Sequence, residues 1–111
     1  MAISSEKRGF PRKEFNDMVL LQIGTDGGDV FERAQVDNIS LGGICFSNIK
    51  ALKGFEHNSG SVLENNQALV YFHANQITVF GTVTRYEPST DRMALSVKRS
   101  TDDDLWSRLC A

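Results

Sequence analysis

The chain has 111 residues, of which 41% are hydrophobic and 23% charged, and these values fit one soluble globular domain. Its formal net charge of −2 disfavours a general nucleic-acid binder, because such proteins usually carry a basic surplus. No apolar run approaches the roughly 20 residues of a membrane-spanning helix, and the first residues lack the apolar stretch of a signal peptide. We therefore expect a cytoplasmic protein without a membrane span.

The N-terminal segment, residues 1–14, has neither a helix nor a strand period. It contains a basic surplus made by Lys7, Arg8, Arg12 and Lys13 against Glu6 and Glu14. Pro11 opposes a helix here because proline biases the preceding residue towards extended geometry. We interpret residues 1–14 as a flexible basic arm, although a charged run of this kind is most often a solvated tail.

Strand patterns follow the arm. Val19, Leu21 and Ile23 alternate with Met18, Leu20 and Gln22, and Thr25-Asp26-Gly27-Gly28 is a strong turn signal. Further strands are expected at residues 30–39, 44–46, 68–72, 77–84 and 93–97. Residues 47–60 are rich in Asn, Ser, Gly and Lys and are interpreted as a long loop.

The last residues predict a short amphipathic helix. Ser100 or Thr101 can cap it, and three aspartates at 102–104 suit its first turn, where unpaired N–H groups carry partial positive charge. Leu105, Trp106 and Leu109 would form its apolar stripe. The predicted fold is thus all-β: a six-stranded antiparallel β-barrel over residues 15–111, with a short C-terminal α-helix and the flexible N-terminal arm.

The turn after the second expected strand contains polar residues that could bind a ligand. Asn38 and Ser40 are on the same edge of an extended backbone, because strand side chains alternate with period two. Gly42 and Gly43 follow and allow a ligand to approach the main chain closely. The turn therefore offers an amide, a hydroxyl and backbone N–H groups to a polar planar ligand or a phosphate. Alternatively, Asn38 and Ser40 only satisfy their own backbone.

No catalytic or metal-binding pattern is found. His57 and His73 have no partner at metal-ligand spacing, and Cys45 and Cys110 do not form a CxxC motif. Gly42-Gly43 does not extend to a phosphate-binding loop, which would need a lysine and a helix. We expect no enzymatic activity, no metal and no cofactor.

Two features separated in sequence could instead act together on a nucleotide. Arg8 and Arg12 lie four residues apart in the arm, and the Asn/Ser/Gly/Gly turn begins at Asn38. An arginine fork can pair with a phosphate or with guanine O6 and N7, and it can stack on a base. Asn and Ser can contact a base edge or a phosphate. Together these residues predict a site for a guanine nucleotide with two phosphates.

These two motifs resemble those of the PilZ domain family. The first is RxxxR, here Arg8-Gly9-Phe10-Pro11-Arg12, and the second is [D/N]xSxxG, here Asn38-Ile39-Ser40-Leu41-Gly42-Gly43. The resemblance covers the whole chain and implies a six-stranded barrel that binds bis-(3′-5′)-cyclic dimeric GMP (cyclic-di-GMP), a bacterial second messenger. It implies that the protein relays the signal to a partner protein as the arm becomes ordered. The alternative is a PilZ-like adaptor that acts by protein contact without nucleotide.

The resemblance also assigns roles to single residues. Arg8 and Arg12 would clamp guanine and phosphate from the arm, Asn38 would bond a guanine edge, and Ser40 would contact guanine or phosphate. Gly42 and Gly43 would bring bare backbone to the ligand. In this family the residue before the first motif arginine helps to decide whether one ligand or a stacked pair binds. Here it is Lys7, which supplies charge for four phosphates, so we expect an intercalated dimer of cyclic-di-GMP.

Overall fold

The computed structural model describes residues 11–25, 28–49, 65–87 and 89–111. It contains six strands and a helix in these ranges. Their bounds are β1 Lys13–Thr25, β2 Gly28–Ser40, β3 Gly43–Ser47, β4 Gln67–Phe72, β5 Ile77–Glu87, β6 Arg92–Ser100 and α2 Asp103–Cys110. Most of the expected loop at residues 47–60 lies outside the described residues.

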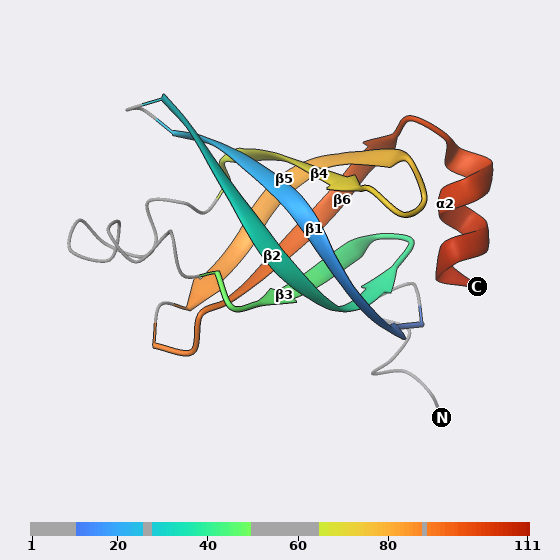
Figure 1. Ribbon diagram of the computed structural model, residues 1–111, viewed down its shortest axis with the longest axis horizontal. Helices are drawn as coiled ribbons and strands as arrows, with labels where there is room; N and C mark the ends of the chain where they lie inside the picture. Colours follow the sequence, from blue (N-terminus) through green and yellow to red (C-terminus); the bar gives the residue numbers. More distant parts are fainter. Residues whose placement is uncertain (1–10, 26–27, 50–64, 88) are drawn as a thin grey trace.

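The strands form a closed antiparallel barrel in the order β1-β2-β3-β6-β5-β4, with β4 pairing back onto β1. Figure 1 shows β1 and β2 as a long twisted ribbon across the front of this barrel, with α2 at the opposite end from the last residues of β1 and the first residues of β2. The predicted all-β barrel with a C-terminal helix is therefore confirmed. The polar turn predicted after the second strand is the connection between β2 and β3.

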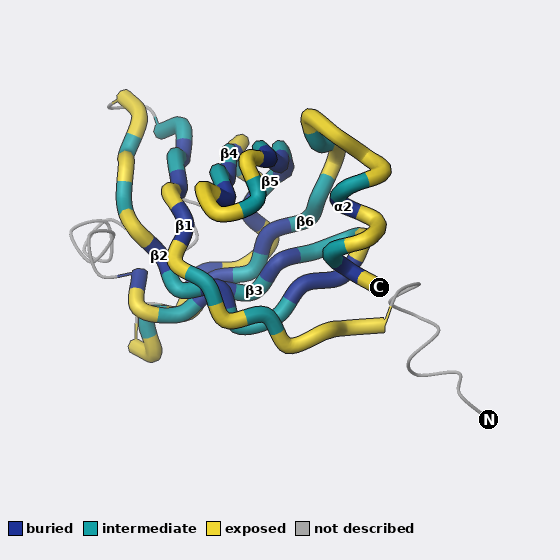
Figure 2. The backbone as a smooth tube through the Cα atoms, turned by 45° about the vertical axis from the view of Figure 1, so that its right-hand side comes forward, coloured by how far each residue is buried: buried dark blue, intermediate teal, exposed yellow. Residues whose placement is uncertain are grey.

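The core fills the inside of the barrel. Alternate residues of each strand are buried, so that Val19, Leu21 and Ile23 point inwards from β1 while Met18 and Leu20 face outwards. The same alternation appears as changes of colour along each strand in Figure 2. The largest fully buried side chains are Phe46 and Phe72. The rigid barrel thus fixes which residues of each strand can meet a ligand on its outer face.

Helix α2 closes one side of the molecule. Its N-cap is Asp102, whose Oδ1 accepts a hydrogen bond from the Leu105 backbone N–H at 3.0 Å, so the expected cap at Ser100 or Thr101 is wrong by one or two residues. The aspartate run supplies both the cap and the acidic first turn, which favours this register. Trp106 is buried and packs on Phe72, with ring centroids 5.7 Å apart.

Cys110, at the end of α2, is a buried free cysteine. Burial raises the pKa of its thiol to about 11, although the positive charge of Lys13 opposes the rise. Because the folded thiol holds its proton more tightly than the unfolded one, its contribution to stability is complete below pH 9 and is lost between about pH 9 and 11. Cys110→Ala should remove this part of the alkaline loss, which chemical denaturation of both proteins at pH 8 to 11 would measure. Parallel stability curves for the two proteins would contradict the assignment.

Candidate ligand site at the β2–β3 turn

Four site positions around the β2–β3 turn lie on the outer face of the barrel. Asn38, Ser40 and Gly43 were predicted, and Cys45 was not. Ser40 pairs with Gly43 across the turn, Ile39 pairs with Ile44, and Asn38 pairs with Cys45. Ile39 and Ile44 are fully buried and point into the barrel. Since strand side chains alternate, the pairs on either side of them face outwards.

Arg12 reaches this face from the base of the arm. Its Nη1 donates hydrogen bonds to Asn38 Oδ1 at 2.8 Å and to Cys45 Sγ at 3.0 Å, although Arg12 and Asn38 are 26 residues apart in sequence. The guanidinium has five N–H donors in a planar fork. Within the described ranges no protein bond from its Nε or Nη2 is found, and the side chain is exposed. One edge of the guanidinium is therefore held and the other is available for a ligand.

Arg12 lies immediately before β1, whose first residues, Lys13 and Glu14, pair with Ile39 and Asn38 of β2. These two residues were assigned to the arm from the sequence, and in the structure they belong to the barrel. Because β1 starts so close to Arg12, the barrel itself positions this arginine beside the turn. The other two arm residues of the predicted site, Lys7 and Arg8, lie outside the described residues.

Ser40 is only 6% exposed, so neighbouring residues cover it although it lies on the outward-facing side of β2. The next residue, Leu41, accepts a hydrogen bond from Trp106 Nε1 through its carbonyl oxygen, at 3.3 Å. Pro11, Leu41, Ser107 and Cys110 line a groove of about 250 Å³ beside this contact. The turn therefore lies between the base of the arm and helix α2.

The two glycines of the turn are held by β6. The Gly42 carbonyl oxygen accepts a hydrogen bond from Val97 N at 3.0 Å. A Cβ added at Gly43 would lie 3.2 Å from the Leu95 carbonyl oxygen. In the described ranges only Gly28 among the glycines has a positive φ, so neither turn glycine needs the left-handed conformation. The structure thus gives Gly43 a packing reason of its own, the close approach of β3 to β6.

Cys45 belongs to the site, and we did not predict it. From the sequence it was noted only as a cysteine that does not form a CxxC motif with Cys110. A two-residue turn between Ser40 and Gly43 fixes the register, so counting back two residues on β2 and forward two on β3 pairs Asn38 with Cys45. That register is the signal that could have identified Cys45 in advance.

The described residues contain no group of three or more His, Cys, Asp or Glu side chains arranged to hold a metal ion. His73 is exposed and its ring packs edge-on to Tyr71, with centroids 5.9 Å apart. Across the same ranges, no helix is long and apolar enough to span a bilayer. The chemistry available at the turn is hydrogen bonding and charge pairing.

Comparison with known proteins gives a structural match. No family model matches the chain, and no curated protein matches its sequence. Among solved structures, the chain is similar to the Bacillus subtilis inhibitor of motility MotI/DgrA, with a TM-score of 0.61 and 19% sequence identity. The match covers 94% of this chain and 49% of that one, so the chain spans about half the length of MotI/DgrA. At this identity the likeness shows a shared fold.

Proposed function

We propose that the chain is a receptor of the PilZ type, which binds cyclic-di-GMP on the outer face of the β2–β3 turn and acts on a protein partner. The observation that carries the proposal is the hydrogen bond from Arg12 Nη1 to Asn38 Oδ1. It joins the last residue of the RxxxR motif to the first residue of the [D/N]xSxxG motif. A chance occurrence of two weak motifs gives no reason for their side chains to meet.

The contact leaves the groups that a guanine nucleotide needs. With Nη1 engaged by Asn38 and Cys45, the Nε and Nη2 donors of Arg12 can pair with guanine O6 and N7 or with a phosphate. Asn38 uses Oδ1 to accept from Arg12, so its Nδ2 donors remain for an acceptor on the ligand. Holding Arg12 in place before binding reduces the entropy lost when the ligand arrives.

The position of the site supports a relay to a partner. Arg12 lies at the base of the arm, and Leu41 contacts α2 through Trp106. A ligand that joins Arg8 and Arg12 to the turn would order the arm against this end of the barrel. The altered surface of arm and helix would then be recognised by a protein partner. The description of MotI/DgrA as an inhibitor of motility supports a regulatory role for this fold.

Calorimetric titration tests the proposal, with cyclic-di-GMP, GTP and a single-stranded oligonucleotide as separate ligands. We expect heat of binding for cyclic-di-GMP alone, with two ligands per chain at saturation and weaker binding as salt is raised. Saturation at one ligand per chain would refute the intercalated pair, but the receptor proposal would stand. No binding of cyclic-di-GMP at millimolar concentration would refute the receptor and leave the adaptor that acts by protein contact, which the inhibitor-like neighbour also supports.

Asn38→Ala and Ser40→Ala test the turn. Each should weaken cyclic-di-GMP binding by about threefold to tenfold, the value of one neutral hydrogen bond, with little change in the melting temperature. Asn75→Ala is the matched control, because Asn75 lies in the β4–β5 turn, away from Arg12 and the β2–β3 turn. If Ser40→Ala unfolded the protein, or if Asn75→Ala weakened binding equally, the turn would not be the ligand site.

A further inference from the structure

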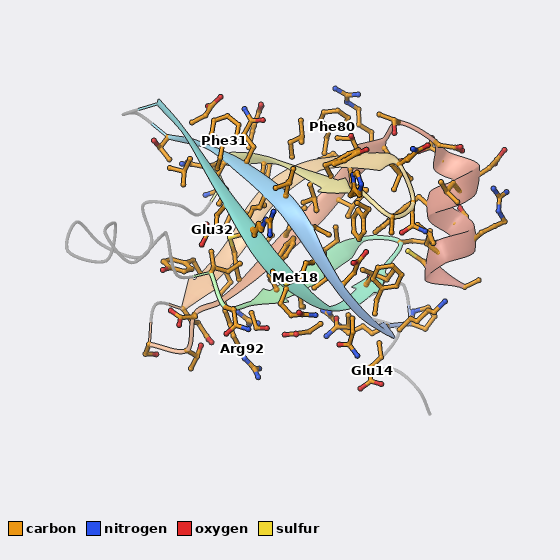
Figure 3. All side chains as sticks on the ribbon, in the orientation of Figure 1. Glu14, Met18, Phe31, Glu32, Phe80 and Arg92 are labelled. Carbon is orange, nitrogen blue, oxygen red and sulfur yellow. The ribbon has the colours of Figure 1, made fainter. Side chains whose placement is uncertain are left out.

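A second surface of the barrel exposes large apolar side chains. Met18 and Leu20 of β1 are 50% and 52% exposed, and Phe31 of β2 is 68% exposed. All three face outwards on the β1–β2 ribbon, where Figure 3 labels Met18 near its middle and Phe31 towards its free end. Isolated exposed apolar residues are ordinary, but a group on one sheet face usually marks a contact surface.

Phe31 projects beside a groove. The groove has a volume of about 200 Å³. Its apolar walls come from Leu20, Leu69, Tyr71 and Phe31 itself, and Gln22 and Glu32 also line it. Register explains its form, because Phe31 pairs with Gln22 on β1 while Leu20 pairs with Tyr71 on β4. Phe31 and the groove together form an apolar surface, and a two-fold contact brings this surface against its own copy.

The charges next to Phe31 are also self-complementary. Asp29 and Arg33 lie two residues before and after Phe31, so all three side chains are on the same face of β2. Asp29 Oδ2 accepts a hydrogen bond from Gln22 Nε2 at 2.7 Å, which holds the carboxylate on this face. The ion pair found among the described residues is Arg85–Glu87, so within those ranges Arg33 forms no ion pair.

We propose that this surface, the Phe31 face, binds a second copy of the chain about a two-fold axis that runs across β2 at Phe31. The two β2 strands then run antiparallel, and the two Phe31 rings pack against each other at the axis, beside the apolar grooves of both copies. The same operation sets Asp29 opposite Arg33 of the partner subunit, and the reverse pair forms on the other side of the axis. The Phe31 face is separate from the β2–β3 turn, so the association does not depend on nucleotide.

Sedimentation velocity on the full chain, from low-micromolar to millimolar concentration, tests the proposal. We expect a reversible monomer–dimer equilibrium for the wild type and a monomer at all concentrations for Phe31→Ser. Arg33→Asp should weaken the dimer about tenfold or more, because both symmetric charge pairs become repulsive. Arg92→Glu is the matched charge reversal, since Arg92 is exposed on β6 and away from the Phe31 face.

The decisive variant is the charge swap, in which Asp29→Arg is added to Arg33→Asp. It restores opposite charges across the two-fold axis, so the swapped protein should dimerise more tightly than Arg33→Asp alone. Far-ultraviolet circular dichroism would verify that each variant is folded. A wild type that stays monomeric at millimolar concentration, a Phe31→Ser protein that still dimerises, or a swap without recovery would each overturn the proposal. If the wild type stays monomeric, the Phe31 face would instead be a contact surface for a different protein.

Discussion

Arg12→Ala is expected to weaken the binding of cyclic-di-GMP by about 10- to 150-fold, the range for a charge-assisted hydrogen bond. Arg12 Nη1 is anchored by Asn38 Oδ1 at 2.8 Å, so the guanidinium meets the ligand without first being ordered. The variant therefore loses both the contact and its preorganisation. Calorimetric titration of the variant against wild type gives the ratio of the two dissociation constants.

Lys13→Ala is the control for charge, because it removes one positive charge from the neighbouring position. It should weaken binding less than Arg12→Ala does, and the difference should persist at high salt. Arg12→Lys should recover only part of the affinity, since lysine lacks the planar fork that can serve Asn38 and a ligand together. Equal affinities for Arg12→Ala and Lys13→Ala would show that Arg12 acts only through its charge.

Gly81→Ala should be the most damaging single methyl addition to the fold. A Cβ at Gly81 would lie 2.0 Å from the Ser96 carbonyl oxygen and 2.9 Å from the Ser96 carbonyl carbon, both of which are backbone atoms of β6. The β5–β6 register shifts between Phe80 and Gly81, which lets the two strands approach this closely. The clash can be relieved only if the two strands separate. The unfolding free energy should therefore fall by about 1–3 kcal/mol.

Thermal unfolding measures this loss, and a fall in melting temperature on the order of 10 °C is expected. Gly24→Ala is the matched control, because a Cβ at Gly24 would meet its nearest atoms, Asp29 Oδ1 and the Gln67 carbonyl oxygen, at 3.7 and 3.8 Å. These are ordinary van der Waals distances, so Gly24→Ala should melt close to wild type. Equal melting temperatures for the two variants would contradict the close approach of β5 and β6 at Gly81.

Strand patterns and turn signals were sufficient to predict the barrel. In residues 18–23 the odd-numbered set Val19, Leu21 and Ile23 was read as one face of a strand, and these are the buried residues. The turn at residues 25–28 was predicted from its Asp-Gly-Gly sequence, and β1 ends and β2 begins within it. Both are local signals, because a period of two and a turn sequence can be recognised without knowing what packs on them.

Features that depend on contacts between distant residues were not predicted. Gly81 appeared as one position in an alternating strand, and only the pairing with β6 gives it a steric role. The helix cap was misplaced because Ser100, Thr101 and Asp102 are all good caps by type, and the exit of β6 decides among them.

For the candidate site, the two motifs were found from sequence, while the contact that joins them and the presence of Cys45 were not. The contact depends on β1 and β2 being paired so that Lys13 lies opposite Ile39, which positions Arg12 beside Asn38. The bulge between Glu14 and Asp17 sets this register. No local pattern encodes this register, because it depends on how the two strands pack against the whole core.

The most direct test of the proposed site is to follow backbone and arginine side-chain signals of isotope-labelled protein by two-dimensional NMR while cyclic-di-GMP is added. The central claim predicts the largest shifts at Asn38, Ser40, Gly42, Gly43 and Cys45 and at the Arg12 Nε–H, with little change at Met18, Leu20 and Phe31. Shifts confined to the Phe31 face, or no shifts at millimolar ligand, would contradict it.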